Sequence, residues 1–312
     1  MLTLTGERTF PTITKIAKAI RTLRIQGAEH IAKAAIKSIL SAVQSSKIHD
    51  SQKLVQLLAQ GRKELEEARI TEPALKNAMK YIFEIDSVVK SNDQNLSDTK
   101  ERIVKKCLEL LTEEQTWTSD IEQCSEKLIK DNIIVYTHCH SSETVRILIK
   151  AKKQGKKFIV VNTETRPLYQ GRITAKELAD AGIEIIHHVD SAMYREIKKS
   201  NLVLLGCDAV TKEGIYNKIG SAIVCDIAKQ FRVPVVICTP TWKYSSTPVS
   251  IEQRSPEEIW PKAPKNIKIH NPAFEIAEKQ KISRMVSEYG ITDFNTFVRN
   301  AEKKWGKNLD TK

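Results

Sequence analysis

The chain lacks several features that would assign it to a common functional class. No apolar run approaches the roughly 20 residues that a membrane-spanning helix needs. The first twenty residues contain no apolar run followed by a small-residue cleavage site, so we expect no secretory signal peptide. Neither a GxGxxG fingerprint nor a Walker A motif is present, which leaves a dinucleotide cofactor without support.

The six cysteines form no CxxC pair, so a zinc ribbon or a thioredoxin-type site is disfavoured and no metal is predicted. Cys207, Cys225 and Cys238 lie inside apolar segments, where cysteine acts as a small hydrophobic side chain. This usage fits a reducing cytoplasm better than secretion, and we predict a cytoplasmic protein.

The net charge is +12, but the lysines are spread along the chain and aromatic residues make up only 6%. Nucleic-acid readers usually gather their positive charge on one face, so nucleic acid is not favoured as a partner. No membrane partner is predicted either. The charge fits a solvated basic surface or the steering of anionic substrates.

The pattern of apolar residues changes near residue 130. Before it, apolar residues recur at three- and four-residue spacing over 20–43, 53–68 and 74–89, and Pro73 marks a plausible helix start. After it, short β-branched runs alternate with helical stretches; the runs are 132–138, 156–162, 182–189, 201–207 and 233–238. The sequence therefore predicts an α/β protein, with a helical domain over 1–130 and a Rossmann-like domain with a mainly parallel sheet over 131–312.

Polar residues follow each of the five predicted strands, at the sheet edge where open parallel sheets bind ligands. Some of these residues are also ordinary helix caps, and capping alone accounts equally well for Ser141, Thr163 and Asp190. A thiol, a carboxylate and several cations at one edge are harder to explain as caps. Helix N-termini and four cations are candidates for holding phosphate: Arg166, Arg172, Lys218 and Lys243.

Cys139 and Asp208 form the most distinctive pair at this edge. Cys139 lies at a predicted strand-to-helix turn, where a helix N-terminus favours the thiolate. Asp208 follows an apolar run, where burial would keep a carboxyl protonated. A base beside an acid suits proton transfer, whereas a buried thiol with a capping Asp is the alternative. His138 and His140 would face away from Cys139 if the strand continued.

Two stretches carry a family resemblance: TETRPLYQGRITAKELADAGIEIIHHVDSA at 163–192 and GCDAVTKEGIYNKIGS at 206–221. They resemble the superfamily of translation initiation factor 2B regulatory subunits, methylthioribose-1-phosphate isomerases and archaeal ribose-1,5-bisphosphate isomerases. The resemblance implies a helical domain followed by a Rossmann-like domain, in a dimer or hexamer. It also implies Cys139 as base, Asp208 as acid, and a set of substrate-binding residues: Gly27, Ala28, Arg69, Ser141, Ser142, Arg166, Arg172, Asn217, Lys218 and Lys243.

The form CHSS followed by TETRP and QGRITAKEL looks most like the ribose-1,5-bisphosphate isomerases. This resemblance implies a phosphorylated sugar substrate in AMP and nucleotide salvage, no cofactor, and AMP as a candidate activator. Three positions depart from the isomerase pattern: Gln26, Pro240 and Glu275. They keep open a non-catalytic regulatory subunit that binds a nucleotide or sugar phosphate together with initiation factor 2. A methylthioribose-1-phosphate isomerase is a third interpretation.

Overall fold

The structure is a computed structural model that describes residues 9–83 and 95–306. The chain forms two compact units, Met1–Gln115 and Thr116–Lys312. The division into domains at 130/131 stays a prediction. Within the described ranges, no helix is both long enough and apolar enough to cross a membrane.

The first unit is helical, as its apolar spacing predicts. Proline is well accommodated at the first position of a helix, and α4 begins at Pro73. The run over 20–43 is not one helix, because the chain turns at 22–27 and Gly27 takes a left-handed φ of 82°. The part of the predicted third helix after Phe83 lies outside the described residues. The helices are α1 (Pro11–Arg21), α2 (Ala28–Gln44), α3 (Ser51–Ala68), α4 (Pro73–Phe83) and α6 (Leu96–Gln123), which ends in the second unit.

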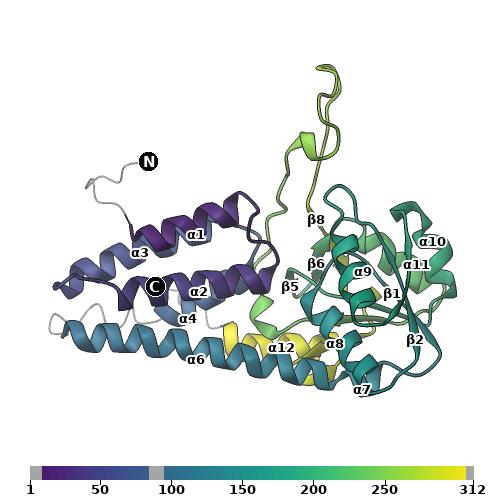
Figure 1. Ribbon diagram of the computed structural model, residues 1–312, viewed down its shortest axis with the longest axis horizontal. Helices are drawn as coiled ribbons and strands as arrows, with labels where there is room; N and C mark the ends of the chain where they lie inside the picture. The colour runs from purple at the N-terminus through teal and green to yellow at the C-terminus, as the bar shows by residue number, and fades with distance from the viewer. Residues whose placement is uncertain (1–8, 84–94, 307–312) are drawn as a thin grey trace. The chain divides into compact units, whose positions relative to one another are not determined.

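A seven-stranded sheet forms the centre of the second unit, in the order β10-β9-β7-β4-β1-β2-β3. Its neighbouring strands β1 and β2 are labelled in Figure 1. All five predicted strands are present, and neighbours among them pair in parallel. The predicted α/β class with a mainly parallel sheet is confirmed. The strands are β1 (Ile133–Thr137), β2 (Phe158–Thr163), β3 (Glu184–His188), β4 (Leu202–Leu205), β7 (Val235–Cys238), β9 (Arg284–Ser287) and β10 (Gly290–Thr292).

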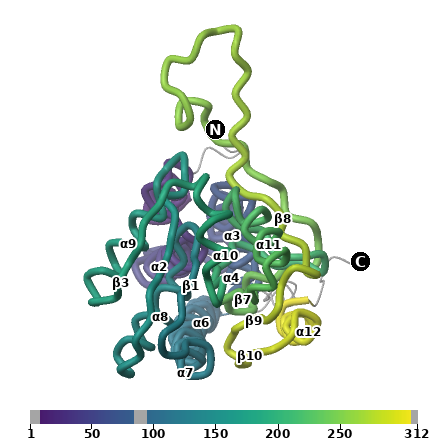
Figure 2. Tube along the Cα trace, turned by 90° about the vertical axis from the view of Figure 1, so that its right-hand side faces the viewer, coloured from purple at the N-terminus to yellow at the C-terminus, as the bar shows by residue number. Residues whose placement is uncertain are grey.

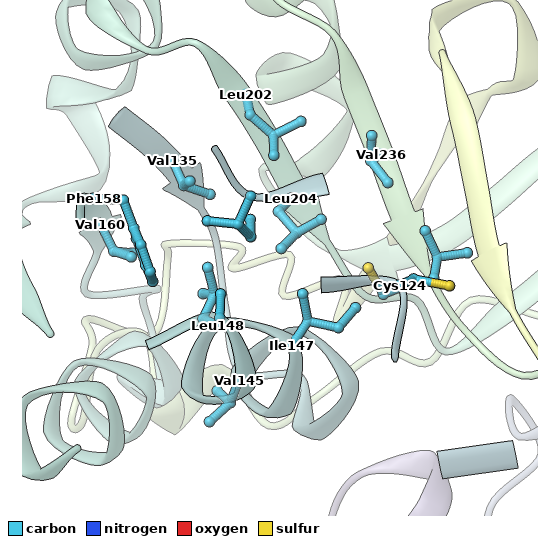
Figure 3. Packing of buried hydrophobic residues seen from close by; sticks show 14 of the residues in the cluster. Cys124, Val135, Val145, Ile147, Leu148, Phe158, Val160, Leu202, Leu204 and Val236 are labelled. Carbon is cyan, nitrogen blue, oxygen red and sulfur yellow. The ribbon is translucent and has the colours of Figure 1, made fainter. Parts of the chain in front are cut away.

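Helices connect the five predicted strands, as their parallel pairing requires. Their apolar faces pack on the sheet, and Figure 3 shows Ile147 and Leu148 of the helix after β1 on the side that faces Val135 and Leu204 of the strands. The segments are α7 (Ser125–Leu128), α8 (Ser142–Lys153), α9 (Gln170–Asp180), η1 (Asp190–Ala192), α10 (Met193–Lys199), α11 (Ser221–Gln230), η2 (Thr241–Lys243) and α12 (Phe294–Trp305).

A second, three-stranded antiparallel sheet was not predicted. It consists of β5 (Ala209–Thr211), β6 (Gly214–Lys218) and β8 (Phe274–Glu278), in the order β5-β6-β8. The hairpin β5–β6 starts directly after Asp208, and its register pairs Ala209 with Tyr216. The hairpin therefore returns the chain so that Lys218, at the end of β6, lies near the end of β4.

A long loop joins η2 to β8 and extends away from the sheet, as the green segment in Figure 2 shows. It contains η3 (Pro256–Glu258), and η4 (Lys279–Lys281) follows β8. The base of the loop is closed by two backbone hydrogen bonds, from Arg254 N to Asn271 O (2.8 Å) and from Ala273 N to Glu252 O (2.9 Å). Because Ala273 O also accepts from Ile219 N (3.1 Å), this base lies beside the end of β6.

Candidate active site at the ends of β1 and β4

The strand order places the ends of β1 and β4 at the topological switch point of the sheet. From β1, the chain moves to β2 and β3 on one side and later to β4 and β7 on the other. Such switch points open a crevice outside the carboxyl ends of the strands, where ligands bind in open α/β sheets. Cys139 follows β1 by two residues and Asp208 follows β4 by three, so both lie at this edge of the sheet.

The loop after β1 is held by hydrogen bonds from the loop after β2 and from α9. Cys139 has a φ of 66°, a left-handed conformation that an L residue keeps only when its surroundings fix it. Its backbone N–H donates to Thr165 Oγ1 (3.0 Å), and its carbonyl accepts from Thr174 Oγ1 (2.9 Å). Asp190 in turn accepts from the backbone N–H groups of Thr165 (2.9 Å) and Arg166 (2.7 Å). The carboxylate of Asp190 therefore fastens two loops together and is more than a cap.

The two histidines beside Cys139 have separate structural roles, because β1 ends at Thr137 and the strand alternation does not continue. His138 is buried; its Nε2 lies 3.0 Å from Ile219 O and its Nδ1 lies 2.9 Å from Thr163 Oγ1. A carbonyl only accepts, so Nε2 carries the proton and Nδ1 accepts from the hydroxyl. Burial lowers the pKa of His138, which keeps the imidazole neutral.

His140 lies against α9, with Nδ1 3.1 Å from Thr174 Oγ1. The hydroxyl proton of Thr174 is already donated to Cys139 O, so Nδ1 of His140 is the donor in this contact. The side chain of His140 thus supports the same threonine that holds the Cys139 carbonyl.

The expectation of a thiolate at Cys139 was wrong for this structure. Burial among protein groups and the negative charge of Asp208 raise the pKa of the Cys139 thiol to about 12. The nearby helix N-terminus does not prevent this, because Ser141 caps α8 and accepts from Thr144 N (3.3 Å) with its own hydroxyl. In the resting site, Cys139 is therefore a thiol.

Lys218 interacts electrostatically with both Cys139 and Asp208. Desolvation by burial lowers the pKa of Lys218, and its electrostatic interactions with Cys139 and Asp208 oppose that shift. The hairpin explains why these groups meet, since Asp208 N donates to Tyr216 O (2.9 Å) and the hairpin ends at Lys218. The protonated state predicted for Asp208 stays a prediction.

The residues after Lys218 form a tightly capped helix start. Asn217 Nδ2 donates to Ser221 Oγ (2.9 Å), and Glu275 Oε1 accepts from the backbone N–H groups of Gly220 (2.7 Å) and Ala222 (2.8 Å). Glu275, one of the three departures from the isomerase pattern, is thus the cap of α11. It already satisfies the N–H groups that a phosphate would use at this helix end.

A glycine turn at Gly220 leads from β6 into α11. Gly220 precedes α11 with a φ of 101°, and a Cβ at this position would lie 2.8 Å from His138 Nε2. Only glycine therefore fits between the helix start and the buried histidine.

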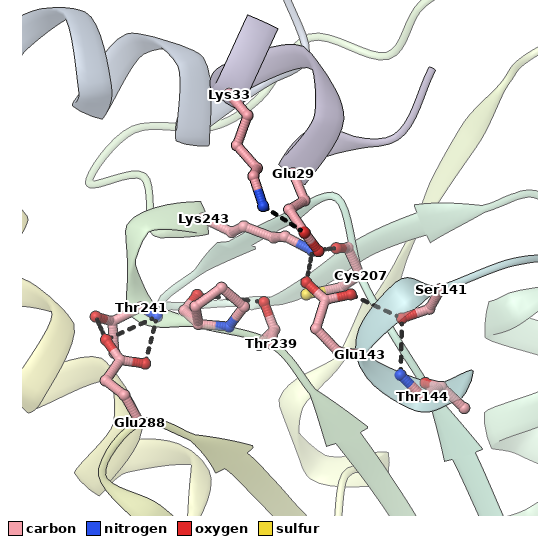
Figure 4. A network of polar contacts seen from close by, with 11 residues as sticks. Glu29, Lys33, Ser141, Glu143, Thr144, Cys207, Thr239, Thr241, Lys243 and Glu288 are labelled. Atoms are coloured by element: carbon pink, nitrogen blue, oxygen red, sulfur yellow. Dashed lines mark hydrogen bonds and ion pairs between the residues drawn. The ribbon is translucent and has the colours of Figure 1, made fainter. Parts of the chain in front are cut away.

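A buried ion pair joins the loop after β1 to the loop after β7. Lys243 Nζ donates to Glu143 Oε1 (2.7 Å) and to Cys207 O (3.0 Å), while Ser141 Oγ donates to Glu143 Oε2 (3.0 Å). Figure 4 shows the Glu143 carboxylate between these partners. Desolvation by burial lowers the pKa of Lys243, but attraction to the Glu143 carboxylate and the other interactions of the ammonium group have a larger combined effect, so the pKa of the lysine is raised overall. Ser142, also predicted to bind substrate, is the first residue of α8.

Two predicted cations lie at the surface. The Arg172 side chain is 57% exposed; it pairs with Glu164 Oε2 (2.9 Å) and its guanidinium carbon lies 3.8 Å from the centroid of the Tyr169 ring. Arg166 is exposed as well and donates from Nη1 to Tyr169 Oη (2.7 Å) and from Nη2 to Ile259 O (3.1 Å). Their role in substrate binding stays a prediction.

Three predicted binding residues belong to the first unit. Gly27 precedes α2, and Ala28 is its first, buried residue. Arg69 follows α3 and is buried, with its Nε 3.6 Å from Glu72 Oε1. Their role in substrate binding also stays a prediction. Gln26, which replaces the arginine of the isomerase pattern, is exposed and donates from Nε2 to Leu23 O (2.8 Å).

The sequence did not point to Glu143, Thr174 or Gly206 as parts of this site. Glu143 reads as an ordinary acidic residue in a first helical turn, and Thr174 reads as an ordinary residue at a helix start. Gly206 is needed because a Cβ there would lie 2.2 Å from Ser141 Oγ. The only available signal was their position in the segments that follow the strands.

The model of the initiation factor 2 subunit family matches residues 24–293 of the chain. The protein belongs to this family. Its family resemblance is confirmed, and its relatives carry two kinds of enzyme name. The chain is 33% identical over 288 residues to ribose 1,5-bisphosphate isomerase of Pyrococcus furiosus, covering 89% of each chain. It is 31% identical over 298 residues to methylthioribose-1-phosphate isomerase of Dehalococcoides mccartyi, covering 88% of each.

Two solved structures from Pyrococcus horikoshii share the fold. The structure titled as translation initiation factor eIF-2B superimposes with a TM-score of 0.79 at 22% identity, covering 92% of this chain and 98% of that one. The structure of 5-methylthioribose 1-phosphate isomerase superimposes with a TM-score of 0.78 at 21% identity, covering 96% and 89%. At these identities the superpositions support the fold alone.

Proposed function

We propose that this protein is a sugar-phosphate isomerase that converts ribose 1,5-bisphosphate to ribulose 1,5-bisphosphate. The observation that carries the proposal is the placement of the Cys139 thiol and the Asp208 carboxylate at the ends of two adjacent parallel strands. The archaeal relatives of that name, at 33% identity over most of the chain, support the same substrate. The buried cations Lys218 and Lys243 suit a substrate with two phosphates.

In the proposed reaction, Asp208 acts as the acid and Cys139 as the base. Asp208 donates a proton to the ring oxygen as the bond from that oxygen to C1 breaks. The Cys139 thiolate takes the proton from C2, and its electron pair forms the C1–C2 double bond of an enol. Return of a proton to C1 and loss of the C2 hydroxyl proton to Asp208 give the ketone, so protons balance and C2 is oxidised while C1 is reduced.

The raised pKa of Cys139 fits this scheme through its coupling to Asp208. A thiol with a carboxylate holds the same single proton as a thiolate with a carboxylic acid, so the two arrangements belong to one titrating pair. Burial and interaction with Asp208 raise the pKa of Cys139 to about 12, which favours the first arrangement in the resting protein. Catalysis needs the second, and the nearby Lys218 ammonium stabilises whichever partner is negative.

We place the reaction in AMP and nucleotide salvage in the cytoplasm, with AMP as a candidate activator and a homo-oligomer as the working form. These assignments follow from the family resemblance. The departures at Gln26 and Pro240 motivate the alternative, a regulatory subunit that binds a sugar phosphate or nucleotide without turnover.

The test is a turnover assay with purified protein, supplied separately with ribose 1,5-bisphosphate and with methylthioribose 1-phosphate, each with and without AMP. The proposal predicts ribulose 1,5-bisphosphate from the first substrate and at least about a hundredfold lower kcat/KM for the second, because one phosphate anchor is lost. Preference for methylthioribose 1-phosphate would assign the other isomerase activity. Binding of either compound without any turnover would favour the regulatory subunit.

A further inference from the structure

Glu143 connects two residues that were predicted to bind substrate. Each of its carboxylate oxygens has one partner: Oε1 accepts from Lys243 Nζ (2.7 Å) and Oε2 accepts from Ser141 Oγ (3.0 Å). The Glu143 and Lys243 side chains are only 5% and 4% exposed. One buried carboxylate therefore controls the orientation of both groups (Figure 4).

The direction of the Lys243 ammonium group follows from its two acceptors. Its second acceptor is Cys207 O (3.0 Å), the carbonyl directly before Asp208. An ammonium group has three tetrahedral N–H bonds, so two fixed acceptors also fix the direction of the third. A lysine normally loses much rotamer freedom when it binds an anion, whereas this one is ordered before the substrate arrives.

Stability alone does not explain the pair. Burying two charges costs desolvation energy that their attraction repays only in part, and apolar residues of similar size often stabilise a fold equally well. The position of the pair is also specific, since Glu143 lies in the first turn of α8, four residues after Cys139, and Lys243 lies in the turn after β7. A charged pair that joins the segments after β1 and β7 fits the orientation of a ligand-binding group.

We propose that Glu143 is a positioning residue that aims the Lys243 ammonium group at an anionic group of the substrate. The proposal rests on the proposed function for the identity of the substrate, a sugar phosphate. It does not require Glu143 to touch the substrate. In this proposal, the acidic partner of Lys243 lies on α8. Pro240, three residues before Lys243, has no acidic side chain that could take this role.

The test is a double-mutant cycle on binding, measured by calorimetric titration with ribose 1,5-bisphosphate in the Cys139→Ser background, which prevents turnover. Glu143→Gln is expected to weaken binding at least tenfold, and Lys243→Met at least as much. Adding Glu143→Gln to Lys243→Met should have less than a twofold further effect, because Glu143 acts through that lysine. Glu196→Gln, a buried glutamate paired with Arg195 on α10, is the matched control and should bind like the parent.

In the protein with Cys139 intact, the same substitution should raise KM more than it lowers kcat, and Glu143→Asp should recover part of the loss. A general loss of structure would instead lower kcat in both Glu143→Gln and Glu196→Gln. The proposal is overturned if Glu143→Gln binds within twofold of the parent, if it weakens binding equally with and without Lys243, or if no variant binds the sugar phosphate at all. Binding that weakens as expected in a protein without turnover would reject the isomerase and keep the positioning role.

Discussion

Lys243 and Arg172 carry the same charge and both follow strands of the same sheet, but their surroundings differ. The Lys243 side chain is 4% exposed and has two fixed acceptors, Glu143 and Cys207 O. Arg172 is 57% exposed and lies on Tyr169 beside Glu164. A buried cation needs a nearby negative group to stabilise its charge, whereas water screens the charge of an exposed cation. Lys243 is therefore part of a buried polar network, whereas Arg172 lies on the surface of the same unit.

The largest expected effect comes from removing the buried cation. Lys243→Met leaves the Glu143 carboxylate buried without its partner, which should cost about 3–5 kcal/mol of unfolding free energy. Chemical denaturation with a probe in the second unit, such as Trp242 fluorescence, measures the loss. The double variant Glu143→Met with Lys243→Met should recover most of it. A single variant as stable as the parent would mean that the pair is not buried in solution.

A smaller effect is expected from the neutral histidine. Burial lowers the folded-state pKa of His138 below its unfolded value of 6.5, so folding releases its proton. The stabilising contribution is therefore complete above pH 6.5 and is lost as pH falls through the folded pKa, with a slope of at most about 1.4 kcal/mol per pH unit. In His138→Gln, the melting temperature should depend less on pH between pH 7.5 and 5.0 than it does in the parent protein.

His187 provides the control for this comparison, since its pKa is also lowered by burial but it lies on the exposed edge strand β3. His187→Gln should flatten the pH dependence less than His138→Gln does. An unchanged profile in His138→Gln would contradict the buried neutral imidazole.

The smallest effect is expected at the exposed arginine. Arg172→Ala should change the unfolding free energy by less than about 0.5 kcal/mol, because a solvent-exposed ion pair contributes little. It should lower kcat/KM for the sugar phosphate less than about tenfold if the guanidinium stays on Tyr169. A loss of a hundredfold or more in steady-state kinetics would place Arg172 among the substrate-binding cations and remove the contrast with Lys243.

The sequence predicted the parallel strands because β-branched runs and amphipathic helices have distinct periods. It missed β5 and β6 because GCDAVTKEGIYNK reads as a loop with polar residues. Cys139 and Asp208 were found from their positions after strands, but the thiol's protonation was not. That state depends on Asp208 and on burial, which only the three-dimensional arrangement supplies. Glu143 was missed for the same reason, since its partner is 100 residues away along the chain.

The most direct test of the central claim compares two cysteine variants in the ribose 1,5-bisphosphate turnover assay. Cys139→Ser removes the proposed base, whereas Cys225→Ser alters a buried thiol of α11 that is not among the predicted site residues. The account predicts that Cys139→Ser lowers kcat by about a thousandfold, within the usual contribution of a general base, with little change in melting temperature. Cys225→Ser should stay within a few-fold of the parent. A Cys139→Ser protein that turns over as fast as the parent would contradict the account.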